Sequence, residues 1–174
     1  MVVVIRPERP GDEVVIRSLV DAAFAPSTDE GRIVDDLRGG EGWIAELSLV
    51  AVDEDGMIVG HCLTSAGRLV ADDGTSRPIL TLGPIAVAPD RQREGIGGDL
   101  MRATIAEASA SGWPVITLLG HPTYYPRFGF VPARGIGIIP PQDWPDDAWM
   151  ALRLPGWTPD LAGHIRFPPA FAID

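Results

Sequence analysis

The residues best suited to chemistry form a basic, glycine-rich segment in the middle of the chain. Arg91 and Arg93 precede the cluster Gly95-Ile96-Gly97-Gly98, and a helical pattern follows it. Glycines directly before a helix let backbone N–H groups converge on one anion, and the helix N-terminus adds unpaired N–H groups and the positive end of its dipole. The two arginines supply local positive charge in a chain whose formal net charge is −10. The segment therefore predicts a phosphate site, with a diphosphate as the expected group.

Two common nucleotide-binding motifs do not fit this segment. It lacks the Gly-Lys-Ser/Thr of a Walker loop, and Gly95-Ile96-Gly97 lacks the third glycine and the early βαβ position of a dinucleotide fingerprint. A glycine-rich turn that only caps a surface helix, with solvated arginines, is the alternative that the segment leaves open. If the segment does bind phosphate, the ligand is a phosphate-bearing molecule other than those that a Walker loop or a dinucleotide fingerprint recognises.

Composition narrows the class of protein. The 174 residues amount to little more than one domain at ~150 residues per domain. The 24 acidic side chains outnumber the 14 basic ones, and the resulting net negative charge repels polyanions. This argues against nucleic acid as a partner. Cys62 is the only cysteine, so an intrachain disulfide is excluded. Because no apolar stretch reaches the ~18 residues of a membrane span and no signal-peptide core is present, we expect a cytoplasmic protein that does not bind membranes.

The N-terminal part of the chain predicts a strand followed by a helix. The run 2–5 is β-branched, as is typical of a strand that opens a fold. Asp12 can cap the helix that follows. Val15, Leu19 and Ala22 repeat with helical periodicity and are expected to face the core.

A second, short helix and a hairpin are expected next. Ser27 and Glu30 stand three residues apart and form a capping-box pattern. The runs 47–52 and 57–63 then read as two strands, and the Asp-Gly turn between them signals a hairpin. The element order is therefore strand, helix, helix, hairpin.

The run 79–88 predicts a third long strand, which Gly83-Pro84 interrupts. Proline cannot donate to a strand ladder, so the run is either two strands or one strand with a bulge or splay that leaves backbone groups without partners. The glycine-rich segment and a helix ending near Gly112 come next, followed by a buried-type strand over 115–119. Beyond it the chain is proline-rich, and 150–154 is the best strand candidate there.

The segment 87–100 resembles the acetyl-coenzyme A (acetyl-CoA) motif of the GNAT N-acetyltransferase superfamily. The motif reads Gln/Arg-x-x-Gly-x-Gly/Ala, and Gln92, Gly95 and Gly97 stand at its defining positions. Downstream, Tyr125-Pro126-Arg127-Phe128-Gly129-Phe130 is similar to the second signature, a tyrosine four residues before Gly-Phe. Two motifs in the right order make the resemblance far stronger than either alone.

Two further segments resemble the bacterial YhbS-type branch of the superfamily. They are Leu82-Gly83-Pro84-Ile85 and Gly120-His121-Pro122-Thr123-Tyr124-Tyr125. The resemblance covers about 1–132 well and the tail 133–174 loosely. It implies an α/β (α+β) fold in a single domain over 1–174. That domain would have a mixed central sheet of about six to seven strands, flanked by helices, with splayed fourth and fifth strands.

Acetyl-CoA is the cosubstrate that the resemblance implies. In the superfamily the splayed fourth strand pairs with the pantetheine arm, while amides of the glycine-rich loop hold the diphosphate. The resemblance therefore implies a cofactor-binding set of ten residues: Ile85, Ala86, Val87, Gln92, Arg93, Glu94, Gly95, Ile96, Gly97 and Gly98.

Acetyl transfer to an amine by direct attack in a ternary complex needs a stabilised oxyanion and a proton for the departing thiolate. We expect Tyr125 to be the general acid, because a phenol (reference pKa ~10) can donate to a nearby thiolate (reference pKa ~8.5). Tyr124 is the competitor, although its spacing to Gly129 differs from the signature. A backbone N–H at Ile85 is the expected oxyanion donor.

The general base is left open. Related enzymes often place His or Glu on the fourth strand, where this chain has Thr81 and Gly83, or use a chain of water molecules. His61 and His121 are candidates, although structural roles are the more common ones for such histidines. No spacing of His and Cys predicts a metal site. Cys62 is expected to be a buried hydrophobic residue rather than a nucleophile.

The acceptor is an unidentified primary amine, and an acidic protein favours a cationic one. Asp29 and Glu30 follow the first helix, where the superfamily usually forms a wall of the acceptor cleft. A solvated helix start is the competing interpretation. Trp144, Trp149 and Trp157 of the tail are expected either to close over the cleft or to lie in a homodimer interface.

A sensor or interaction module that binds CoA or acyl-CoA with little catalysis is the alternative function. The missing base on the fourth strand favours it, whereas retention of Tyr125 favours catalysis. A thioesterase or another acyl-chain specificity is a lesser variant.

Overall fold

The computed structural model describes residues 2–173 and divides into two compact units. Unit 1 contains residues 2–64 and 83–107, and unit 2 contains residues 65–82 and 108–173. Two long strands, β3 (Ile58–Val70) and β4 (Ser76–Val87), contribute residues to both units.

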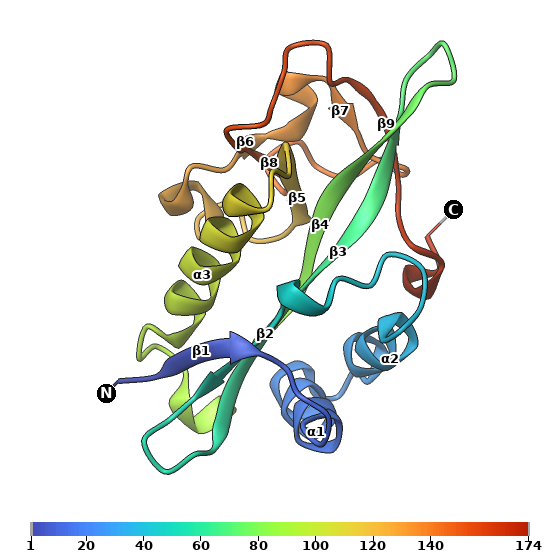
Figure 1. Cartoon of the computed structure of the whole chain (residues 1–174). Helices are drawn as coiled ribbons and strands as arrows, with labels where there is room; N and C mark the ends of the chain where they lie inside the picture. Colours follow the sequence, from blue (N-terminus) through green and yellow to red (C-terminus); the bar gives the residue numbers. More distant parts are fainter. Residues whose placement is uncertain (1, 174) are drawn as a thin grey trace. The chain divides into compact units, whose positions relative to one another are not determined.

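Unit 1 holds the N-terminal elements and most of the central helix. Figure 1 shows α1 (Glu13–Phe24) and α2 (Asp29–Leu37) on one side of its strands and α3 (Ile96–Ala110) on the other. These elements are β1 (Val4–Pro7), α1 (Glu13–Phe24), α2 (Asp29–Leu37), β2 (Ser48–Val52) and α3 (Ile96–Ala110). The helix-strand order of the N-terminal half is therefore the predicted one.

The predicted hairpin of unit 1 is confirmed. β1 pairs antiparallel with β2, and β2 pairs antiparallel with β3. The backbone N–H of Asp53 donates to the carbonyl of Met57 at 2.9 Å and closes the turn. The strand predicted over 2–5 forms as β1, displaced by two residues to Val4–Pro7.

Of the core-facing stripe predicted for α1, Leu19 is confirmed, whereas Val15 and Ala22 are wrong. Val15 is 44% exposed and Ala22 is exposed, whereas Ile16, Leu19 and Val20 are buried. After Glu13 the helix has three apolar residues in succession, so helical periodicity alone permits more than one stripe. Packing selects the stripe that contains Ile16.

The helix caps predicted from the sequence also differ from those observed. Asp12 lies at the N-cap of α1, but its carboxylate accepts a hydrogen bond from Arg6 at 2.7 Å and none from the helix. Thr28 is the N-cap of α2, and Ser27 Oγ donates to Glu30 at 2.7 Å. The Asp12 carboxylate is therefore oriented by Arg6, and the Ser27 hydroxyl by Glu30.

The proline-rich tail supplies most of unit 2. β5 (Val115–Leu119) pairs with β8 (Trp149–Arg153), β8 with β6 (Val131–Pro132), and β9 (Gly163–Arg166) with β3 and β7 (Ile138–Ile139). The sheet is mixed, as predicted, since β4 is parallel to β5 and β7 is parallel to β9. Within residues 2–173 it has nine strands rather than six to seven, because the tail adds very short ones.

Aromatic residues of the tail pack into the core of unit 2. Trp149 is fully buried, and its indole Nε1 donates to the carbonyl of Ile138 at 3.0 Å. The ring of Trp144 lies 5.3 Å from that of Trp149, and Trp157 packs against the same cluster. Trp149 is therefore a core residue of unit 2, and Trp144 and Trp157 are half-buried against the same cluster.

Candidate functional site

The loop between β4 and α3 has a defined turn geometry. A 3-10 turn, Pro89–Arg91, follows β4, and the side-chain amide of Gln92 donates to the carbonyl of Val87 at 3.3 Å. Arg93 and Gly95 have positive φ angles of 66° and 91°. Glycine adopts such angles readily, whereas they are uncommon for arginine. Two residues in the left-handed region therefore flank Glu94 just before the helix.

The N-terminal turn of α3 is fixed against β3. The side chain of Ile96 is 4% exposed. A Cβ at Gly60 would lie 3.0 Å from both Ile96 and Leu100, so β3 and α3 approach closely here. Gly97 and Gly98 are half-buried. Because the Ile96 side chain is buried, a ligand could reach only the backbone N–H of this residue. The N–H groups of the first turn of α3 have no hydrogen-bond partner within the helix.

β4 is one continuous strand, so the two-strand interpretation is wrong. Its parallel ladder with β5 includes the pair Thr81 and Thr117, and β4 itself continues to Val87. Gly83 has a φ of 144°, and Pro84 has no N–H to donate. Of the three residues expected along the pantetheine arm, Ala86 is buried, and Ile85 and Val87 are half-buried.

Tyr125 belongs to unit 2, whereas the glycine-rich loop belongs to unit 1. It begins a 3-10 turn, is half-buried, and lies edge-on to Tyr124 and Phe130 at ring distances of 5.0 and 6.0 Å. A Cβ at Gly120 would collide with its ring, so the glycine permits this position. The ring of Tyr124 instead lies under the guanidinium of Arg127 at 4.5 Å. The two tyrosines therefore have different surroundings.

A buried polar network, which no sequence pattern indicated, surrounds His61. The His61 ring is fully buried, and its Nε2 lies 3.0 Å from Ser48 Oγ and 3.7 Å from a carboxylate oxygen of Glu8. Ser48 donates to the same Glu8 oxygen. Arg38 binds Glu8 at 2.6 Å and Asp35 at 3.0 Å. Within unit 1 the network joins Glu8, which follows β1, to the C-terminal end of α2, to β2 and to β3.

The protonation states in this network follow from its donors. Since Ser48 donates to Glu8, His61 Nε2 carries the proton and donates to Ser48 Oγ. Burial lowers the pKa of His61 and outweighs the attraction to Glu8, so the ring is neutral. Burial would raise the pKa of Glu8, but hydrogen bonds from His61, Arg38 and Ser48 lower it to about 2. His61 is therefore a structural histidine rather than an accessible base.

Cys62 is a buried hydrophobic residue, as predicted. It is fully buried, its Sγ lies 3.6 Å from the Oγ1 of Thr104, and burial raises the pKa of the thiol to about 11. His121, by contrast, is exposed just after β5. Among residues 2–173 no group of three or more His, Cys, Asp or Glu side chains could hold a metal ion. In the same range no helix is long and apolar enough to span a membrane.

The acidic residues proposed for the acceptor cleft lie at the start of α2. Asp29 is exposed, whereas Glu30 is half-buried and accepts the hydroxyl of Ser27. Asp29 is therefore the more available of the two for a cationic ligand.

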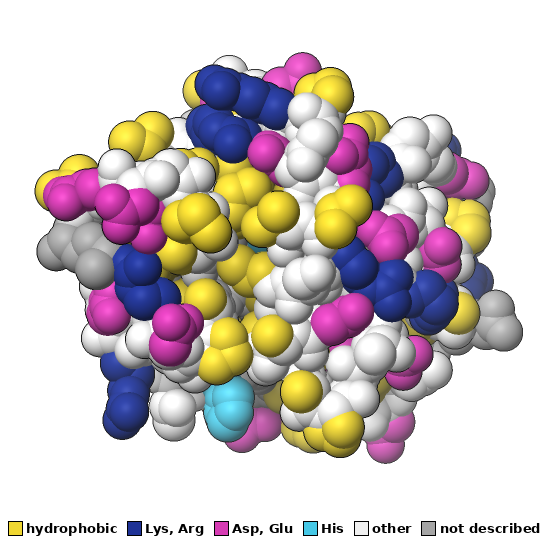
Figure 2. All heavy atoms as spheres, turned by 90° about the horizontal axis from the view of Figure 1, so that it is seen from below, with side chains coloured by type: hydrophobic (Ala, Val, Ile, Leu, Met, Phe, Trp, Pro, Cys, Tyr) yellow, Lys and Arg dark blue, Asp and Glu magenta, His cyan; other side chains and the backbone are white. Residues whose placement is uncertain are grey.

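Charges on the face of the molecule in Figure 2 are interspersed. Arginine side chains lie beside acidic ones there, and they do not merge into one basic surface. Ion pairs such as Arg17 with Asp21 and Arg32 with Asp36 have this arrangement.

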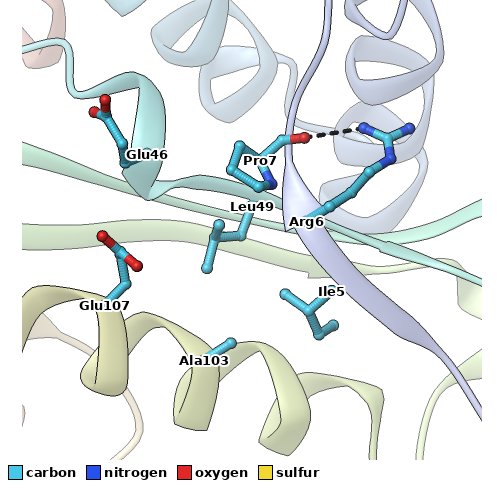
Figure 3. Close-up of a pocket in the computed structure, with 7 residues that line it drawn as sticks. All are labelled: Ile5, Arg6, Pro7, Glu46, Leu49, Ala103 and Glu107. Carbon is cyan, nitrogen blue, oxygen red and sulfur yellow. Dashed lines mark hydrogen bonds between the residues drawn. The ribbon is translucent and has the colours of Figure 1, made fainter. Parts of the chain in front are cut away.

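A separate open pocket of about 220 Å³ lies in unit 1 between β1 and α3 (Figure 3). The residues that line it are Ile5, Arg6, Pro7, Glu46, Leu49, Ala103 and Glu107. Figure 3 shows apolar side chains of β1, β2 and α3 directed into it, with two carboxylates nearby. None of the residues predicted to bind acetyl-CoA lines this pocket.

Comparison with protein families gives a clear match. The profile described as "Acetyltransferase (GNAT) domain" matches residues 4–133. The uncharacterized N-acetyltransferase YjhQ of Escherichia coli K12 is 36% identical over 156 residues, which cover 87% of this chain and 84% of that protein. The uncharacterized N-acetyltransferase YhbS of the same strain is 31% identical over 126 residues, 72% of each chain.

Solved structures agree in fold. The crystal structure of E. coli YhbS in complex with CoA has a TM-score of 0.86 and 25% identity, and the match covers 98% of this chain and 92% of that one. The structure of a GNAT family acetyltransferase from Brucella melitensis in complex with acetyl-CoA has a TM-score of 0.78 and 35% identity, with 98% of each chain covered.

Proposed function

Because the chain belongs to the GNAT family of acetyltransferases, we propose that it transfers an acetyl group from acetyl-CoA to a primary amine. The observation that carries this proposal is the loop that opens α3, where Arg93 and Gly95 have positive φ next to the glycines of the first helical turn. The complexes of the E. coli and B. melitensis relatives with CoA and acetyl-CoA support the same ligand.

Binding would use mainly backbone groups. The N–H groups from Arg93 to Gly98 would surround the diphosphate, aided by the helix dipole. The pantetheine arm would lie along Ile85–Val87, after the interruption at Gly83-Pro84. Since backbone N–H groups carry no net charge, this arrangement suits a chain that is acidic overall.

The reaction would be a direct attack. The neutral amine nitrogen attacks the thioester carbonyl carbon and forms the C–N bond, while the N–H of Ile85 donates to the oxyanion. Collapse of the tetrahedral intermediate breaks the C–S bond, and the CoA thiolate takes a proton from the phenol of Tyr125. The attacking nitrogen loses its proton to a base. His121 is exposed to solvent, whereas His61 is buried and neutral, so His121 is the better histidine candidate.

The acceptor is proposed to be cationic in its free form. The acidic chain and the exposed carboxylate of Asp29 at the start of α2 support this preference. A panel of cationic, neutral and anionic amines tests it. Faster turnover of neutral or anionic amines would contradict it.

The first experiment is a calorimetric titration of acetyl-CoA, with CoA and NAD as comparison ligands. Gly97→Trp should abolish binding, because the indole would fill the space of the diphosphate. Ala106→Trp, on an exposed position of the same helix, should bind normally and controls for the added bulk. If none of the three ligands binds the wild-type protein, the proposed function is wrong.

The second experiment separates enzyme from sensor. Thiol release is followed in the presence of the amine panel, and product mass gives the acyl group transferred. The chain contains no lysine, so acetylation of its own side-chain amines cannot contribute to the signal. Binding without thiol release for any amine would favour a CoA-binding module. The observation that favours this alternative is that β4 carries Thr81 and Gly83 where related enzymes often carry a base. Thiol release without an amine would indicate a thioesterase.

A further inference from the structure

An ion pair connects the β2–β3 hairpin to the glycine-rich loop, and we propose that this pair, Asp53 with Arg91, holds the loop in its diphosphate-binding conformation. Both residues lie in unit 1, 38 positions apart in the sequence. The inference rests on the proposed function, because it assigns a positioning role in the proposed cofactor site. Both would be positioning residues, acting on the ligand through the loop backbone.

Asp53 uses its two carboxylate oxygens for different purposes. One oxygen, Oδ1, accepts the backbone N–H groups of Asp55 and Met57 at 3.1 and 2.9 Å and so fixes the hairpin turn. The other, Oδ2, accepts a hydrogen bond from Arg91 Nη1 at 3.1 Å. The carboxylate is therefore held by its own turn before it contacts the loop, which reduces the entropy lost when the pair forms.

Arg91 is held equally firmly on the loop side. Its backbone N–H donates to the carbonyl of Ala88 at 2.8 Å, and its Nε lies 3.1 Å from Glu94. The side chains of Arg91 and Asp53 are 18% and 9% exposed, so the pair is part-buried. Arg91 thus ties the first turn of the loop to Glu94, the residue next to Gly95, and to the hairpin. The guanidinium fork contacts both carboxylates at once, which lysine could not reproduce.

The sequence alone suggested that Arg91 lends positive charge to the diphosphate. The structure places two carboxylates against it instead, so its charge is compensated locally. The two roles predict opposite effects at Asp53. If Arg91 acted by charge, removal of the Asp53 charge would release the guanidinium and tighten the binding of an anion. If the pair positions the loop, removal of either partner weakens binding.

Two substitutions test this difference. Asp53→Asn keeps an oxygen that can accept the turn N–H groups, so the hairpin is preserved while the ion pair is lost. Arg91→Gln removes the partner charge. The double variant gives the coupling between them. Arg32→Gln, in the exposed α2 pair with Asp36, is the matched control for loss of one arginine charge.

Acetyl-CoA affinity is measured by calorimetry for the five proteins. Positioning predicts that Asp53→Asn and Arg91→Gln each raise Kd by about fivefold, that the KM for acetyl-CoA rises in parallel, and that the double variant is no weaker than either. Tighter binding by Asp53→Asn with weaker binding by Arg91→Gln would overturn the proposal in favour of direct charge. Unchanged affinity in both would overturn it as well.

Hydrogen exchange of the ligand-free protein tests the same pair without any ligand. Faster exchange of the amides of 92–98 in Asp53→Asn and Arg91→Gln, but not in Arg32→Gln, is expected because the loop loses its attachment. Equal exchange in all variants would overturn the inference. A wild-type protein that fails to bind acetyl-CoA would overturn the proposed function, whereas this exchange measurement would still decide whether the pair orders the loop.

Discussion

Replacement of Glu8 by Gln should destabilise the fold in a way that depends on pH. Glu8 contacts Arg38, Ser48 and the buried His61, and these partners lower its pKa from 4.5 to about 2 against the opposing effect of burial. The carboxylate side chain is 8% exposed, so solvent screens these contacts little. Gln has nearly the same shape but no charge, so it removes the ionic part of the network.

The expected magnitude follows from the linkage between proton binding and folding. A folded-state pKa lowered from 4.5 to about 2 corresponds to about 3 kcal/mol of stability. Because the pKa is lower in the folded state, this contribution is fully present above the unfolded-state pKa of 4.5. It is lost as the pH falls from 4.5 toward 2, where the folded protein also binds the proton. The difference between wild type and Glu8→Gln should therefore be largest at neutral pH and shrink in acid.

Urea unfolding at a series of pH values from 7 down to 3 measures this difference. Titration of the other carboxylates cancels when the two proteins are compared at each pH. Glu41→Gln, at an exposed position, is the control and should match wild type within about 0.5 kcal/mol. A difference between Glu8→Gln and wild type that is the same at pH 7 and pH 3 would refute the reasoning, because it would then have no ionic origin.

Three further predictions concern other parts of the chain. Tyr125→Phe should lower turnover more than about tenfold with little change in acetyl-CoA affinity. Tyr124→Phe is the control and should retain turnover. Equal steady-state rates for Tyr125→Phe and wild type would remove Tyr125 from the mechanism. Trp149→Ala should cost about 3–5 kcal/mol in urea unfolding, and Val14→Ala, at a 77% exposed position, should cost far less; similar losses would contradict the assigned core. Cys62 should react with a thiol reagent only as the protein unfolds, since burial raises its pKa to about 11; rapid reaction of the native protein would disprove this.

Features encoded in short segments could be predicted from the sequence. The Asp-Gly turn, the long strand that became β4 and the helix after the glycine cluster each depend on a few neighbouring residues. The similarity to GNAT acetyltransferases, which depends on residues at fixed spacing, was likewise readable and is confirmed by the family match to 4–133. The predicted cofactor-binding residues of the loop lie together at the start of α3, while the role of Tyr125 stays a prediction.

Features that depend on distant partners could not be predicted. Arg38 and Glu8 are 30 positions apart, so no local pattern pairs them. Local periodicity also could not choose between Val15 and Ile16, since both fit a helical stripe. The tail appeared mostly irregular because prolines interrupt it, yet Trp149 has a fully buried position there. In each case tertiary packing, which local propensity does not contain, decided the outcome.

The division of the two units along the chain has a consequence for synthesis on the ribosome. Every residue of unit 1 precedes position 108, so its sheet and helices can assemble while the last part of the chain is still being translated. Unit 2 cannot, because β9 pairs with β3 through Arg166 and Arg68, almost 100 residues apart. Until β9 emerges, the edge of β3 and the apolar face over Leu69 and Ile79 lack their final cover. A nascent chain stalled before Gly163 therefore lacks the strand that pairs with this edge of β3.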